Sequence, residues 1–348
     1  MRRVLIFVFL VILLSPGVRG MEFEAPPPPE SATAYLPKEA DSFGEGLLRV
    51  CGAAVNVLEP AMSLAARSCL RVLIALTLVG LVRQMAPSLS GKTVELAGTA
   101  AVAALLLEPS ASVVALAVET VDSLREYGKL LLPVMASALA ARGGVSASGA
   151  LYVGTAVVDT VLGAAVTWTA VPVCWMYLAL SVASAAVGGG LLGQLRDLLR
   201  WVMEWALKLT IYLFTGYMAI TGAVSGAADA AATRAAKIAI SGAVPVVGGI
   251  LSDAAETVLL SAGALGSGAG IWGILTVLAI FCAPALKIGC QYLMLKVTAV
   301  LGSAMGGASG AKLAEDFAAG MGLLMALVST VAVLLLVSSV CFLRGLGG

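Results

Sequence analysis

The chain is dominated by long apolar runs that are separated by short segments carrying charge. A helix needs about 20 mainly apolar residues to cross the hydrocarbon core of a bilayer, where every backbone polar group must be satisfied internally. The longest runs lie at 69–85, 96–118, 160–195, 209–228, 271–295 and 317–343. The pattern therefore predicts an all-α, polytopic helical membrane protein with about six to eight spans, some of them broken or re-entrant.

Helix-breaking residues interrupt this pattern at 242–259, where the sequence reads GAVPVVGGILSDAAETVL. Pro245 cannot donate a backbone hydrogen bond, and Gly248 and Gly249 allow the backbone to turn. Irregular backbone at membrane depth persists only where protein or a water-filled cavity satisfies its polar groups. We therefore expect a broken helix here and treat the segment as a candidate functional element.

Two carboxylates, Asp253 and Glu256, follow this break. Their spacing matches a capping pair at the start of the apolar run that begins at Val258. The alternative is ion coordination, because a capped half-helix opposite the end of a broken helix is how transporters build substrate sites. We favour the capping interpretation.

Four prolines hint at an internal repeat, since Pro133 and Pro172 have the same separation as Pro245 and Pro284. Paired broken helices occur in the repeated halves of transporters. The alternative is that proline is common enough in membrane helices to give this spacing without duplication. The apolar run 130–141 is too short to cross a bilayer straight and contains Pro133, so we expect it to be re-entrant or broken.

Two ionisable residues lie in apolar surroundings. Asp159 stands between charge-free stretches, and Lys287 lies in the run that we expect to bend at Pro284. An ionisable group within the membrane is costly and often marks an ion or proton pathway. The alternatives are that Asp159 caps a helix at a span boundary and that Lys287 snorkels to the interface.

A charged stretch between the apolar runs has helical spacing. Arg196, Arg200, Glu204 and Lys208 recur at every fourth position and so share one face of a helix. Two tryptophans lie close by in the sequence, as interfacial aromatics do. We predict an amphipathic helix that lies in the membrane interface and leads into the span at 209–228.

The chain divides into segments by composition. Residues 1–20 combine two arginines, an apolar core and small residues near the end, which is typical of a cleavable signal peptide; an uncleaved anchor is the alternative. We then expect an extracytoplasmic Pro-rich and acidic tail with an amphipathic helix at 21–67, N-terminal spans at 68–129, and two membrane halves at 130–228 and 229–348.

Composition narrows the function classes. Of the 348 residues, 60% are hydrophobic and 12% are charged, and the formal net charge is +1. The basic residues are scattered, so nucleic acid is not an expected partner, whereas the lipid bilayer is. The chain lacks histidine, which removes imidazole-based catalysis and metal binding, and its cysteines form no C-x-x-C motif. We expect no enzymatic activity, no cofactor and no metal site.

The stretch AAKIAISGAVPVVGGILSDAAETVL, from Ala235 to Leu259, closely resembles stage III sporulation protein AE of endospore-forming bacteria. The similarity extends in pattern from about Leu130 to Gly307 and includes the signal peptide and the polar N-terminal region. It implies a multi-pass protein of the mother-cell membrane that surrounds the forespore. The implied partners are other stage III sporulation membrane proteins, a cytoplasmic ATPase subunit and a forespore membrane partner.

The expected function is a membrane component, without catalytic residues, of the channel or secretion-like complex that this resemblance implies between mother cell and forespore. The alternative is an autonomous ion-coupled secondary transporter that uses Asp159 and the broken helices as a coupled site. The chain has no Walker motif, so any energy for transport would come from a gradient or from a separate subunit.

Overall fold

The computed structural model describes residues 25–36, 43–85, 91–141, 154, 166–188, 190–220, 268–305 and 308–347. Every regular element within these ranges is helical. The predicted signal peptide lies outside them, as do these candidate site residues: Asp159, Pro245, Gly248, Gly249, Asp253 and Glu256. The all-α prediction is confirmed for the described part of the chain.

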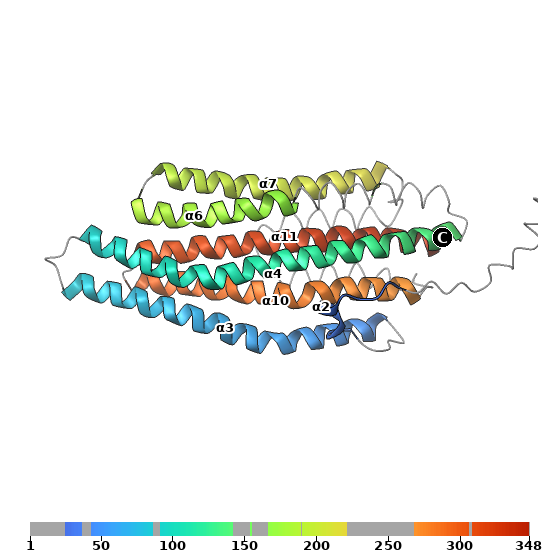
Figure 1. Ribbon diagram of the computed structural model, residues 1–348, viewed down its shortest axis with the longest axis horizontal. Coiled ribbons are helices and arrows are strands. Elements are labelled where there is room, and N and C mark those ends of the chain that lie inside the picture. Colours follow the sequence, from blue (N-terminus) through green and yellow to red (C-terminus); the bar gives the residue numbers. More distant parts are fainter. Residues whose placement is uncertain are drawn as a thin grey trace, which may run out of the picture.

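A central bundle is formed by α3 (Phe43–Met85), α4 (Gly91–Ala141), α10 (Gly268–Ala304) and α11 (Ala308–Gly347). These helices run along the long axis of the molecule, and α3 with α4 and α10 with α11 form antiparallel pairs (Figure 1). The short helix α2 (Glu30–Thr33) packs against α10.

The α10–α11 pair forms the interior of the central bundle. Within an apolar 18-residue stretch of each helix, 83% and 78% of the residues are buried in α10 and α11, compared with 28% and 33% in α3 and α4. This difference follows from the sequence, because a helix that is apolar on all sides can be enclosed by other helices. The outer helices α3 and α4 carry most of the charged residues of the bundle.

Glycines allow close approach between these helices. A Cβ atom at Gly80 of α3 would lie 2.7 Å from the backbone oxygen of Met305, just after α10. A Cβ atom at Gly273 of α10 would lie 2.6 Å from Cδ1 of Leu131 in α4. Small residues at helix contacts are characteristic of membrane bundles, where packing rather than the hydrophobic effect drives helix association.

The described helices include five that are long and apolar enough to cross a membrane: those in α3, α4, the α6 region, α10 and α11. This supports the prediction of a polytopic membrane protein. With 43 and 51 residues, α3 and α4 are roughly 65 and 77 Å long at about 1.5 Å per residue. Because the hydrocarbon core is only about 30 Å thick, a large part of each helix lies outside it.

The break expected at Pro133 is absent, because α4 continues through Pro133 to Ala141. The flanking residues Leu131, Leu132 and Met135 are buried, whereas Pro133 itself is exposed. Packing of α4 against α10 and α11 therefore holds the helix together across the missing backbone hydrogen bond. Similarly, Pro284 lies within the continuous helix α10.

A second layer consists of α6 (Val171–Val187) and α7 (Gly190–Ile220), which pack against each other and against α11 (Figure 1). A π-helical turn, Val166–Ala170, precedes α6. Pro172 lies in the first turn of α6, where the missing backbone N–H of proline is tolerated. Gly188 has φ of 67° and ends α6, which allows the sharp reversal into α7.

Candidate functional site

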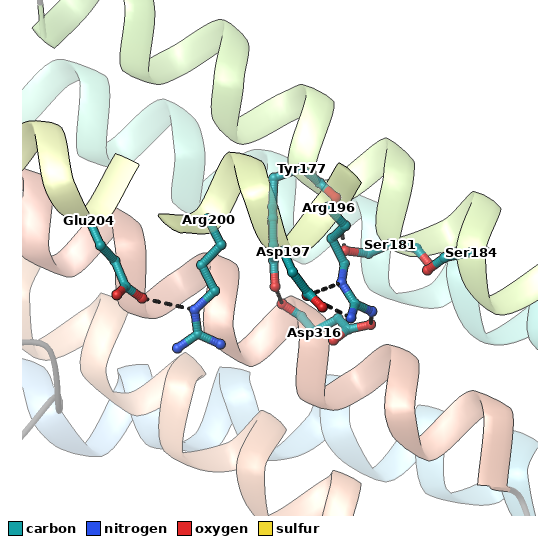
Figure 2. Close-up of polar contacts among 8 residues, drawn as sticks. All are labelled: Tyr177, Ser181, Ser184, Arg196, Asp197, Arg200, Glu204 and Asp316. Atoms are coloured by element: carbon teal, nitrogen blue, oxygen red, sulfur yellow. Dashed lines mark hydrogen bonds and ion pairs between the residues drawn. The ribbon is translucent and has the colours of Figure 1, made fainter. Parts of the chain in front are cut away.

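A buried ion pair joins the second layer to the central bundle. Arg196 of α7 points toward α11, where its Nη1 donates to Oδ2 of Asp316 (Figure 2). The two side chains are only 9% and 13% exposed. Breaking a buried pair by removing one partner is strongly destabilising, so each of these charges depends on the other.

The guanidinium of Arg196 is shared between two carboxylates. Its Nε and Nη2 atoms donate to Oδ1 of the neighbouring Asp197, at 2.9 and 2.8 Å. The Asp197 side chain is 65% exposed, so it contacts Arg196 from the outer side while Asp316 contacts it from within. The planar, multi-donor geometry of arginine suits this arrangement, which a lysine ammonium would not reproduce.

Tyr177 brings α6 into the same cluster. Its hydroxyl donates to the backbone oxygen of Asp316 at 3.0 Å, and the residue is almost fully buried. A Cβ atom at Gly320, one helical turn after Asp316, would lie 3.0 Å from Cδ2 of Leu178, so this glycine lets α6 approach α11 closely. Ser181 donates back to the Tyr177 carbonyl at 2.8 Å. The cluster therefore connects α6, α7 and α11.

A second ion pair continues the charged face of α7. Nε of Arg200 donates to Oε1 of Glu204 at 2.9 Å, one helical turn after Arg196 (Figure 2). These side chains are 46% and 28% exposed, so the pair is less enclosed than the pair at Asp316. The charged face predicted from the spacing is present, but its residues differ in burial, because Arg196 is buried against α11 and Arg200 is exposed.

The inward direction of Arg196 differs from that expected in the predicted interfacial helix. A helix lying in the interface would turn its charged face to water and its apolar face into the membrane. Instead, Arg196 of α7 pairs with Asp316 of α11, and α7 runs as one helix from Gly190 to Ile220 alongside α6. The prediction did not include Asp316, whose neighbours in sequence gave no sign of a partner in α7.

The sequence-predicted site residues that the structure describes lie apart from this cluster. Pro133 is exposed on α4, Pro172 lies in the first turn of α6, and Pro284 and Lys287 lie on α10. Lys287 is exposed, which fits the snorkelling alternative. None of them is among the residues that form the ion pair or its hydrogen bonds.

The chemistry of the cluster is that of an ionic and hydrogen-bonded connection between helices. Arginine remains charged under ordinary conditions, and its donors here are directed at two carboxylates. Within the described ranges, no group of three or more Cys, Asp or Glu side chains is placed to hold a metal ion. A buried charge pair of this kind in a membrane protein marks either a pathway or a specific helix contact.

Comparison with known proteins places this chain in a family. The family model for stage III sporulation protein AE matches residues 50–344, which includes nearly all of α3 and extends into the end of α11. No curated protein and no solved structure gave a match. The match covers most of the 348 residues, and the chain therefore belongs to the stage III sporulation protein AE family.

Proposed function

We propose that this protein is a multispanning membrane component of the channel or secretion-like complex that connects mother cell and forespore during endospore development. The observation that carries the proposal is the family match over residues 50–344, which takes in the central bundle and the α6–α7 layer. The protein would lie in the mother-cell membrane around the forespore, with its N-terminal tail outside the cytoplasm.

The geometry supports a structural role within such a complex. The charged side chains Arg196 and Asp316 contact each other, and Tyr177 donates to the backbone of α11. These groups connect helices, which is what a framework subunit requires. Under this proposal the partners are other stage III sporulation membrane proteins, a cytoplasmic ATPase subunit that supplies energy, and a forespore membrane protein.

The described helices provide no observation that favours the alternative, an autonomous ion-coupled transporter. That alternative relied on Asp159 and on helices broken at paired prolines. Among those prolines, Pro133 and Pro284 lie within continuous helices. The membrane-component proposal is therefore the one we retain.

Deletion of the gene in a spore-forming host tests the proposal. We expect engulfed forespores to lose late forespore gene expression, and a wild-type copy to restore it. Normal late expression in the deletion strain would contradict the proposal. Complementation with Arg196→Ala should restore expression less well than complementation with Arg49→Ala, because Arg49 forms only an exposed pair with Glu45.

Affinity purification distinguishes the two functional classes. A tagged chain, extracted from sporulating cells in mild detergent, should co-purify with further sporulation membrane proteins and with an ATPase. Recovery of the chain alone, together with ion-coupled flux in reconstituted vesicles that Asp159→Asn abolishes, would support the transporter instead.

A further inference from the structure

We propose that α7 crosses the bilayer, with its apolar face against the lipid acyl chains and with Arg196 directed inward to α11. This inference concerns the surface that the second layer presents to its surroundings, and it does not depend on the proposed function. It replaces the interfacial position expected from the charge spacing alone.

The connection between α6 and α7 is the first reason. The segment Trp168–Val187, which includes α6, is long and apolar enough to cross a membrane. Only Gly188 and the following residue separate α6 from α7, and α7 runs back alongside α6 (Figure 1). A helix that returns along a transmembrane neighbour lies at the same depth as that neighbour. If α6 spans the bilayer, α7 therefore spans it in the opposite direction.

The polarity of α7 is the second reason. Its buried positions include Met203, Leu207 and Phe214 together with the charged Arg196, so the charged and apolar inward residues share one side of the helix. Its exposed large apolar residues are Leu191, Leu195, Leu198, Trp201, Val202, Trp205, Tyr212 and Leu213. The side chains of Asp197 and Arg200 are also exposed, at 65% and 46%, but the large exposed residues of α7 are mainly apolar, unlike those of a helix on a water-facing surface. The outward face of α7 suits hydrocarbon.

The extent of this face is the third reason. Leu191 and Leu213 are 75% and 57% exposed and mark its two ends. At about 1.5 Å per residue they are roughly 33 Å apart along the helix axis, which matches a hydrocarbon core of about 30 Å. The apolar face is therefore long enough to cross the bilayer.

The charges that lower the average hydropathy of α7 are largely accommodated by the protein. Arg196 is paired with Asp316, and Arg200, which is 46% exposed, is paired with Glu204, while Lys208 is partly buried. The more exposed Asp197 accepts two hydrogen bonds from Arg196. Charged residues in transmembrane helices are tolerated when they face the bundle interior and pair with one another.

The occupant of the outward face is lipid, because the face continues onto a neighbouring membrane-length helix. On the α6 side, Trp168, Met176 and Val187 are exposed as well, at 81%, 53% and 73%. The segment Trp168–Val187 carries no charged residue. Both helices of the α6–α7 layer thus expose large apolar side chains, as a surface in contact with acyl chains should, and the exposed charges Asp197 and Arg200 are each in an ion pair.

Spin-label accessibility in the full-length protein tests this proposal. The label is attached at Leu198→Cys on the outward face, in a variant without native cysteines that is reconstituted in phosphatidylcholine vesicles. Leu207→Cys, which is only 7% exposed on the same helix, is the matched control. We expect several-fold more frequent collisions with oxygen at position 198 than at position 207, and few collisions at position 198 with a water-soluble nickel chelate.

Two results would overturn the proposal. Frequent collisions with the nickel chelate at position 198 would place the face in water, and low accessibility to both reagents would mean that protein covers it. A second measurement leaves α7 unaltered: brominated acyl chains should quench a variant that retains only Trp201 and Trp205, with the other tryptophans replaced by phenylalanine. Fluorescence that is unchanged by the brominated lipid would also reject lipid contact.

Discussion

Arg196 and Asp316 are 120 positions apart in the sequence, yet their side chains form a buried ion pair between α7 and α11. The pair, together with Tyr177, connects the second layer of the molecule to the central bundle.

Loss of Arg196 should destabilise the protein more than loss of an exposed arginine. Removing one partner of a buried ion pair costs about 3–5 kcal/mol, because the remaining charge stays buried. We expect Arg196→Ala to lower the free energy of unfolding by about this amount. Asp316→Ala should have a smaller effect, because Arg196 keeps Asp197 as a partner. Reversible unfolding in detergent or lipid micelles measures both.

The matched control is Arg49→Ala, since Arg49 pairs with Glu45 at the surface and is 53% exposed. Exposed pairs contribute about 0–1 kcal/mol. The charge reversal Arg196→Asp with Asp316→Arg should recover part of the stability that either single reversal loses. Equal effects of Arg196→Ala and Arg49→Ala would show that the buried pair contributes nothing specific.

Tyr177→Phe tests the contribution of α6 to the cluster. The substitution removes the hydroxyl that donates to the backbone oxygen of Asp316 but keeps the buried ring. Because a typical hydrogen bond contributes about 1 kcal/mol, we expect a loss of that size in unfolding free energy. Tyr177→Ala should cost about 3–5 kcal/mol, because it also leaves a cavity. Similar losses for both variants would assign the effect to the hydroxyl rather than to packing.

Two glycines in α3 should respond to alanine in opposite directions. At Gly80 a Cβ atom would lie 2.7 Å from the Met305 backbone oxygen, so Gly80→Ala should push α3 away from α10 and lower the midpoint of thermal unfolding. At Gly52 nothing lies within 4 Å of a Cβ atom. Gly52→Ala should therefore stabilise the protein by about 0.5–1 kcal/mol, the helix preference of alanine over glycine. A change in stability in the same direction for both substitutions would contradict the close contact between Gly80 and Met305.

Pro133→Ala distinguishes a continuous helix from a functional break. Pro133 is exposed within α4, where proline removes one backbone hydrogen bond. Alanine restores that donor and removes no buried contact, so we expect a higher midpoint of thermal unfolding, by up to about 3 kcal/mol in free energy. Sporulation should be unaffected by the substitution. A stable variant that fails in sporulation would indicate that a break at Pro133 matters after all.

The apolar pattern predicted the class of fold well and the extent of the helices less well. The predicted spans 69–85 and 96–118 lie within α3 and α4, which are much longer. Hydrophobic run length reports only the part of a helix that is suited to hydrocarbon. In the structure α3 packs against α10, and α4 packs against α10 and α11, and such contacts between distant segments are not visible in local sequence.

For the candidate site, helical spacing in the sequence identified Arg196 but not its partner Asp316. Helical periodicity placed Arg196 and Arg200 on one face, as the structure has them. It did not indicate whether that face meets water, lipid or protein, since each is compatible with the same spacing. Asp316 directly precedes the last apolar run. A carboxylate in that position is ordinarily interpreted as the boundary of a span, so nothing in the sequence indicated a partner in α7.

The sequence by itself determined that this chain is helical and membrane-bound, because composition and run length act locally on each segment. It also determined the family, because the family model matches the sequence over residues 50–344. Only the tertiary structure decided that α4 continues through Pro133 and that Arg196 of α7 turns inward to meet Asp316. Both outcomes depend on which helices lie side by side. Contacts between segments that are distant in the sequence decide whether a proline is tolerated within a helix and which partner a charged side chain meets.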